Sequence, residues 1–179
     1  MTTEYLVLSA LGTDRPGIVD QLAKAAAASG CNIEDSRMTV LGGEFAVLML
    51  VSLPEGRSAD LDEGLGGLAG RGYKVTATPA DRTYAEAHPG WLPYRIEVHG
   101  ADHEGIIHEV ASYLSRRGIS IESMESECTP APTSGVPLFA MTAEVVVPPG
   151  LADQGWEEGL DEIGRRLNLE IAATSAGNA

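Results

Sequence analysis

The chain has 179 residues, of which 44% are apolar and 21% are charged. These proportions are typical of globular proteins and exclude disordered, collagen-like and disulfide-framework chains. The 26 acidic residues outnumber the 12 Lys and Arg residues, which gives a net charge of -14. Such a charge repels phosphate backbones and anionic lipids. We therefore expect neither direct nucleic-acid binding nor binding to a membrane surface.

Three features of the sequence predict a cytoplasmic location. The longest uninterrupted apolar run, residues 45–51, is far shorter than the ~20 residues that cross a bilayer. The first residues carry no basic region, so the sequence predicts no secretory signal. Only Cys31 and Cys128 are present, which fits a reducing compartment and requires no disulfide.

The first half of the chain predicts a strand, a helix, two strands, a helix and a strand, in that order. Consecutive apolar residues at 6–8 indicate a buried strand, and Gly42 and Gly43 are typical of a turn that closes a hairpin. The second helix contains the glycine-rich segment 64–68, which weakens it or lets another backbone approach. The predicted strands cover residues 5–11, 32–41, 45–53 and 73–78, and the predicted helices cover residues 16–29 and 59–71.

The second half of the chain repeats the pattern of the first. Gly12, Asp14 and Gly17 recur 88 positions later, whereas from Phe45 onward the offset is 94. The additional residues fall in segment 129–135, whose Pro, Thr, Ser and Gly content predicts an enlarged hairpin loop. The predicted strands cover residues 94–98, 119–127, 138–147 and 169–174, and the predicted helices cover residues 105–117 and 156–167.

Two βαββαβ units therefore follow from the sequence. This order is that of the ferredoxin-like fold in the α+β class, an antiparallel sheet with both helices on one face. We expect the first unit to span residues 1–80, a linker to span 81–93 and the second unit to span 94–179. The other face of each sheet must be covered, so we expect the two units or two chains to pack together, most simply as a homodimer.

The segment Asp-Arg-Pro-Gly-Ile-Val at residues 14–19, with Asn32 and Ile33 after the helix, resembles the ACT domain family of amino-acid-sensing modules. Two such units in tandem resemble in particular the glycine cleavage system transcriptional repressor family. The resemblance implies regulation by a small amino acid rather than catalysis, and no cofactor. Since the acidic charge disfavours contact with DNA, a transcriptional role in glycine or one-carbon metabolism implies action through a DNA-binding partner protein.

The resemblance also implies a ligand site where the first turn and helix of one unit meet a neighbouring unit. The free N–H groups at a helix start attract a carboxylate, and Asp14 offers an acceptor to an ammonium group. Alternatively the turn is only structural, with Asp14 capping the helix and Arg15 solvated. The predicted ligand-binding residues are Gly12, Asp14, Arg15, Gly17, Ile18, Asn32 and Ile33. Their counterparts in the second unit, where Glu104 at the helix start opposes a carboxylate, are Gly100, Asp102, His103, Gly105, Ile106, Ser120 and Ile121.

Two other functions compete with an amino-acid sensor. The first is a protein–protein interaction module whose turns are structural and bind no ligand. The second is a metal-dependent enzyme that uses His99, His103 and His108, but the spacing of the last two misses the i, i+4 geometry of one helix face. Because no nucleophile elbow or phosphate-binding loop is present, we expect no catalytic residue. Because of the histidine spacing, we also expect no metal. The sequence does not identify the amino acid, the partner protein or the units that pair.

Overall fold

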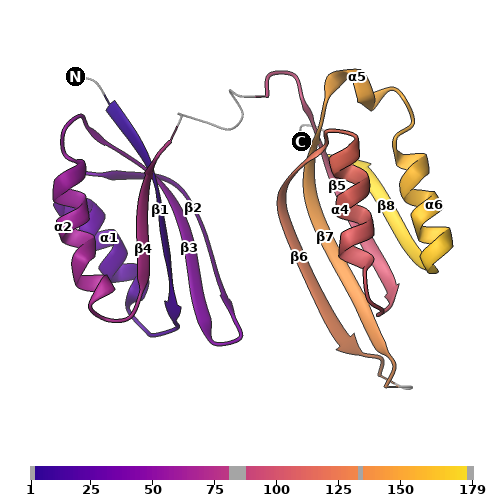
Figure 1. The fold of residues 1–179 in the computed structure, drawn as a ribbon, viewed down its shortest axis with the longest axis horizontal. Helices are drawn as coiled ribbons and strands as arrows, with labels where there is room; N and C mark the ends of the chain where they lie inside the picture. The colour runs from indigo at the N-terminus through magenta and orange to yellow at the C-terminus, as the bar shows by residue number, and fades with distance from the viewer. Residues whose placement is uncertain (1–2, 81–87, 133–134, 177–179) are drawn as a thin grey trace. The chain divides into compact units, whose positions relative to one another are not determined.

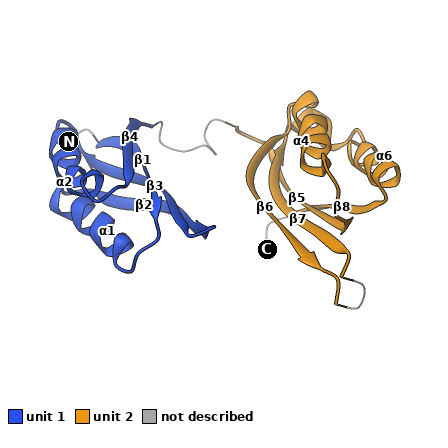
Figure 2. Cartoon of the chain, turned by 60° about the horizontal axis from the view of Figure 1, so that its bottom comes forward, with its two compact units in different colours: residues 1–87 blue, residues 88–179 orange. Residues whose placement is uncertain are grey.

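The structure is a computed structural model that describes residues 3–80, 88–132 and 135–176. The chain divides into two compact units, residues 1–87 and residues 88–179 (Figure 2). Most of the predicted linker, residues 81–87, lies outside the described residues. No helix in the described part of the chain is long and apolar enough to cross a bilayer.

Unit 1 is a four-stranded antiparallel sheet with strand order β2-β3-β1-β4. Its two helices cover one face of the sheet (Figure 1). The core between them is mostly aliphatic and includes Leu8, Leu22, Val51 and Leu61. The elements are β1 (Thr3–Thr13), α1 (Ile18–Ala28), β2 (Asn32–Leu41), β3 (Glu44–Pro54), α2 (Ser58–Ala69) and β4 (Lys74–Pro79).

Unit 2 has the same topology, with strand order β6-β7-β5-β8, so the predicted α+β fold of two ferredoxin-like units is confirmed. A one-turn helix, α5, was not predicted from the sequence. The predicted loop 129–135 is shorter than expected because β6 continues through Pro130, and residues 133–134 lie outside the described residues. The elements are β5 (Leu92–Ala101), α4 (Ile106–Arg116), β6 (Ser120–Pro130), β7 (Pro137–Val147), α5 (Pro149–Ala152), α6 (Glu157–Leu167) and β8 (Leu169–Ser175).

Glycines determine two local features of unit 1. Gly42 and Gly43 have φ angles of +60° and +84° and join β2 to β3, as the hairpin prediction requires. In the glycine-rich part of α2, Gly64 faces α1, where a Cβ would lie 3.6 Å from the Cβ of Ala25 in ordinary van der Waals contact. Gly66 and Gly67 face open space, and α2 nevertheless remains helical through them.

A β-bulge in β2 decides which of its side chains face the helices. The pairing register with β3 shifts between Ile33 and Asp35, and the extra residue reverses the inside–outside alternation. Beyond the bulge, Met38 and Val40 pair with buried residues of β3 and so lie on the helix-covered face. Strand β6 has a bulge at the equivalent position.

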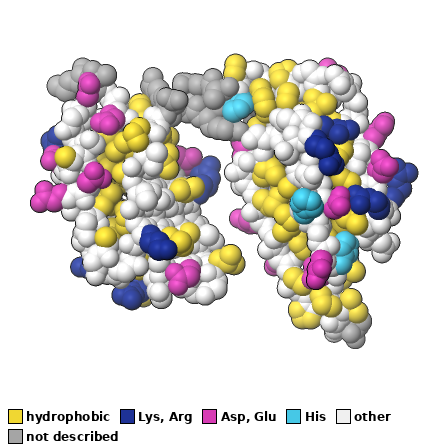
Figure 3. Space-filling view, in the orientation of Figure 1, with side chains coloured by type: hydrophobic (Ala, Val, Ile, Leu, Met, Phe, Trp, Pro, Cys, Tyr) yellow, Lys and Arg dark blue, Asp and Glu magenta, His cyan; other side chains and the backbone are white. Residues whose placement is uncertain are grey.

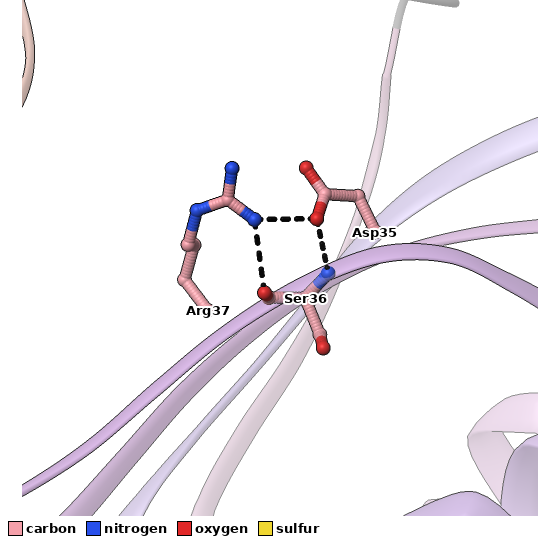
Figure 4. A network of polar contacts seen from close by, with 3 residues as sticks. All are labelled: Asp35, Ser36 and Arg37. Atoms are coloured by element: carbon pink, nitrogen blue, oxygen red, sulfur yellow. Dashed lines mark hydrogen bonds and ion pairs between the residues drawn. The ribbon is translucent and has the colours of Figure 1, made fainter.

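The charged residues Asp35 and Arg37, which follow this bulge, lie on the opposite, open face of the sheet. They pair in register with Leu50 and Leu48 of β3. Asp35 accepts hydrogen bonds from the backbone N–H of Ser36 at 2.7 Å and from the Arg37 guanidinium at 2.5 Å (Figure 4). Such an exposed ion pair stabilises a protein by at most about 1 kcal/mol, so the bulge rather than the pair sets the alternation.

The two sheets differ on the faces that their helices leave open. In unit 1 the exposed side chains of this face include the aliphatic Leu11 and Leu48. In unit 2 the face is charged, and Arg95 forms a 2.8 Å ion pair with Glu144. The expectation that the open faces are covered is therefore better supported for unit 1, whose exposed leucines lie beside the single ion pair of Asp35 and Arg37. Further acidic residues on the open face of unit 2 are Glu97, Glu125, Glu127 and Glu170.

Candidate amino-acid site at the start of helix α1

A pocket of about 430 Å³ lies in unit 1 between the start of α1 and the hairpin of β2 and β3. This volume falls in the range of ~300 to 1,000 Å³ that is typical of small-molecule sites. The turn from β1 to α1 forms one side of the pocket, and residues of β2 and β3 form the other. The lining residues are Asp14, Arg15, Pro16, Gly17, Ile18, Val19, Met38, Thr39, Val40 and Phe45.

The charged side chains of the turn are unpaired. The backbone N–H of Asp14 donates to the carbonyl of Gly43 at 2.9 Å, which ties the turn to the hairpin. Within the described residues, however, neither the Asp14 carboxylate nor the Arg15 guanidinium makes a hydrogen bond or an ion pair. Helix α1 has no side-chain cap, so the alternative in which Asp14 caps this helix is wrong. A carboxylate and a guanidinium thus stand free at the mouth of the pocket.

The backbone at the start of α1 leaves hydrogen-bond donors available. Gly17 has a φ angle of +90°, a left-handed conformation that favours glycine, and the helix begins at the next residue, Ile18. The Ile18 N–H donates to the Arg15 carbonyl at 3.3 Å and the Gln21 N–H to the Gly17 carbonyl at 3.1 Å. Among the described residues, the N–H groups of Val19 and Asp20 therefore remain without an acceptor, and no side chain caps them. Together with the helix dipole they form a site that favours a carboxylate.

Gly12 does not lie in the pocket, although the sequence placed it in the ligand site. It is buried, and a Cβ at this position would come within 2.6 Å of the ring of Tyr73. The Tyr73 hydroxyl donates to the backbone oxygen of Thr13 at 2.7 Å, which holds the ring in place. Gly100 plays the same part in unit 2, where a Cβ would lie 2.5 Å from Leu169. Both glycines are explained by packing rather than by the approach of a ligand.

Asn32 and Ile33 lie at the far end of β2 from the pocket. Asn32 pairs in register with Ser52 and donates to Glu34 at 3.1 Å. The eight residue steps from Asn32 to Val40 span about 26 Å in an extended strand. Within one unit, the structure therefore does not bring Asn32 and Ile33 to the turn. Of the predicted ligand-binding residues it brings together Asp14, Arg15, Gly17 and Ile18.

The corresponding turn in unit 2 keeps the backbone geometry and changes the chemistry. Gly105 has a φ angle of +91°, and the Asp102 N–H donates to the carbonyl of Pro137 at 2.9 Å. The Asp102 carboxylate, however, lies beside the Cys128 thiol, and desolvation and this carboxylate together raise the pKa of Cys128. His103, which replaces Arg15, lies 3.2 Å from the backbone oxygen of Leu167. Ile106 is buried, and Ser120 and Ile121 lie at the far end of β6.

His99, His103 and His108 do not converge on one point. His99 lies on the open face of β5, whereas His103 contacts backbone oxygens beside the ends of α4 and α6. Within the described residues, no group of three or more His, Cys, Asp and Glu side chains is arranged to hold a metal ion. These histidines therefore give no support to the metal-dependent alternative.

Replacing Asp102 with asparagine is expected to speed alkylation of Cys128. The carboxylate raises the thiol pKa, so its removal lowers that pKa and increases the fraction of reactive thiolate near neutral pH. We expect iodoacetamide to modify Cys128 about 2-fold to 10-fold faster, since each pKa unit changes this fraction up to tenfold. Peptide mass spectrometry measures the rate, with Cys31 as the internal control. An unchanged rate at Cys128 would show that Asp102 does not bind the thiol.

Sequence comparison identifies the modules from which the chain is built. A model of the ACT domain family matches residues 4–71. A glycine cleavage system transcriptional repressor of Escherichia coli is 56% identical over 48 residues, which are 27% of this chain and 25% of that protein. A UPF0237 protein of Methanopyrus kandleri is 45% identical over 58 residues, 32% of this chain and 61% of that protein. The matched region thus spans only a quarter of the length of the E. coli relative.

Structural comparison extends the similarity to both units. A protein of unknown function from Galdieria sulphuraria has a TM-score of 0.82 and 31% identity, over 98% of this chain and 99% of that one. A provisionally assigned glycine cleavage system transcriptional repressor has a TM-score of 0.71 and 23% identity, over 99% of this chain and 100% of that one. At this identity the comparison supports the fold alone. The chain therefore carries an ACT domain at residues 4–71, has a tandem ACT-like fold of two units, and resembles the glycine cleavage system transcriptional repressor family.

Proposed function

We propose that this protein is a non-catalytic regulator that binds a small α-amino acid in the pocket of unit 1 and thereby alters its interaction with a protein partner. The observation that carries the proposal is the arrangement at the start of α1. An unpaired carboxylate, an unpaired guanidinium and an uncapped helix start surround a pocket of ligand size. Its ACT domain and its similarity to a transcriptional repressor support a regulatory role.

An α-amino acid matches the two signs of charge at this turn. Its ammonium group would donate to the Asp14 carboxylate, and its carboxylate would accept from the N–H groups of Val19 and Asp20 and from Arg15. Hydrogen bonds to charged groups stabilise a complex more than neutral ones do, by about 1.5 to 3 kcal/mol each. Ligand binding regulates a partner only if one arrangement of the protein binds the amino acid more tightly than another.

The proposal includes two protein partners, a second copy of the chain and a DNA-binding protein. The aliphatic open face of unit 1 supports a homodimer, because an exposed apolar face favours association. The net charge of -14 opposes direct contact with DNA, and Lys and Arg side chains of the described residues gather in no continuous patch on the face seen in Figure 3. A DNA-binding protein is therefore the partner through which it would control genes of glycine or one-carbon metabolism, as the name of the E. coli relative suggests.

Asp14→Asn is expected to weaken amino-acid binding at least ~10-fold, because it removes the negative charge that pairs with the ammonium group. Isothermal titration against a panel containing glycine, L-serine, L-leucine and L-phenylalanine measures the dissociation constants, and thermal unfolding reports the accompanying stabilisation. A ligand at a hundredfold excess over its dissociation constant stabilises the folded state by ~2.7 kcal/mol.

Asp102→Asn is the matched control, because it makes the same change at the equivalent position of unit 2. We expect this variant to bind as the unmodified protein does. Equal weakening in the two variants would remove the assignment to unit 1. Binding of no amino acid by the unmodified protein would instead support an interaction module, which the aliphatic open face of unit 1 favours.

A further inference from the structure

We infer that the amino acid bound in unit 1 carries an apolar side chain, of the size of leucine or phenylalanine, rather than being glycine or serine. The inference rests on the proposed function and adds the ligand class. It follows from the wall of the pocket that faces the charged turn.

This wall is apolar and open to water. Val19, Met38 and Val40 line the pocket and are 39%, 46% and 52% exposed, and the buried Ile18 and Phe45 lie behind them. Covering apolar surface is favourable roughly in proportion to the area removed from water. Glycine has no side chain with which to cover this wall, and serine has too small an apolar surface to do so.

The polar and apolar halves of the pocket come from different elements. Asp14 and Arg15 belong to the turn before α1, whereas Met38 and Val40 belong to β2. An amino acid whose charged groups bind the turn therefore directs its side chain toward β2. The bulge in β2 places apolar residues there, since without it the charged Asp35 and Arg37 would occupy the helix-covered face.

Unit 2 shows that the fold does not require an apolar wall. Its Ser126 and Cys128 pair with Met141 and Phe139 of β7, as Met38 and Val40 pair with β3. Both units form the same sheet with the same bulge, so the stability of the fold explains neither Met38 nor Val40. Their apolar character in unit 1, beside the unpaired charges of the turn, points to a ligand with an apolar side chain.

Titration of the full-length protein with L-leucine, L-phenylalanine, glycine and L-serine tests the inference. We expect leucine or phenylalanine to bind at least ~10-fold more tightly than glycine, since even small differences in apolar contact discriminate by about 10-fold or more. If glycine or serine binds as tightly as leucine and phenylalanine do, the inference is wrong and the proposed function still stands. Binding of none of the four would overturn both.

A double variant transplants the wall of unit 2 into unit 1. M38S with V40C is expected to reduce the preference for the apolar amino acid over glycine at least ~10-fold. Both side chains are about half exposed, so the unit should stay folded, and thermal unfolding verifies this. L48S makes a similar change on the open face, outside the pocket, and should preserve the preference. If the double variant alters dimerisation and leaves the preference unchanged, this wall is a contact between copies of the chain and the inference is wrong.

Discussion

Replacement of Trp156 by alanine is expected to destabilise unit 2 by about 3 to 5 kcal/mol, the usual consequence of removing a buried aromatic side chain. Trp156 is 2% exposed, packs edge-on against Tyr94 with ring centroids 5.2 Å apart, and accepts a hydrogen bond on its backbone oxygen from the Tyr113 hydroxyl. Urea unfolding followed by circular dichroism should show the transition of unit 2 at a lower concentration. Binding in unit 1 should persist below that transition.

Trp156→Phe is the control for this variant. Within the described residues the buried indole Nε1 finds no acceptor, and an unpaired buried donor destabilises a folded protein by about 1 to 3 kcal/mol. Phenylalanine removes this donor and retains much of the buried ring, so we expect it to destabilise unit 2 far less than alanine. Equal losses from the two variants would show that the indole itself, rather than the buried volume, stabilises unit 2. A simultaneous loss of amino-acid binding would show that the units do not act independently.

Most of the fold was predictable because its signals are local. The consecutive Leu6, Val7 and Leu8 form a central strand with buried and partly buried side chains, and the left-handed pair Gly42 and Gly43 closes the expected hairpin. The boundary of α1 was less predictable. Pro16 suits a first helical turn, but the φ angle of +90° at Gly17 interrupts the helical backbone, so the helix begins after both residues.

The candidate site was only partly predictable, because its apolar wall depends on non-local pairing. Asp14 and Arg15 could be found from the turn itself. Met38 and Val40 could not, because the bulge before Asp35 reverses the alternation of β2 and is defined by pairing with β3. The alternation of polar and apolar residues from Arg37 to Val40 is the one local signal of this wall. The position of Asn32 was predicted wrongly for a related reason. Asn32 follows the end of α1 in the sequence, whereas the pocket lies at the beginning of that helix.

Gly17→Val is expected to destabilise unit 1 by about 1 to 3 kcal/mol and to abolish amino-acid binding. A β-branched residue is strained at a φ angle of +90°, and relief of this strain rotates the peptide groups that begin α1. Those groups carry the N–H donors proposed to bind the ligand carboxylate. Urea unfolding measures the first effect, and titration with the tightest-binding amino acid of the panel measures the second. Gly17→Asn, a residue that tolerates the left-handed region, should show both effects more weakly.

Gly105→Val distinguishes the effect of backbone strain from the loss of the ligand site in unit 1. Gly105 has a φ angle of +91° at the equivalent turn of unit 2, so valine should destabilise that unit by a similar amount. Only the turn of unit 1 combines this backbone with a free Asp14 carboxylate and an apolar wall, so only Gly17→Val should abolish binding. If Gly105→Val abolishes it equally, the ligand depends on both units. If Gly17→Val leaves it intact, the amino acid binds elsewhere, and the unpaired charges at the start of α1 require another explanation.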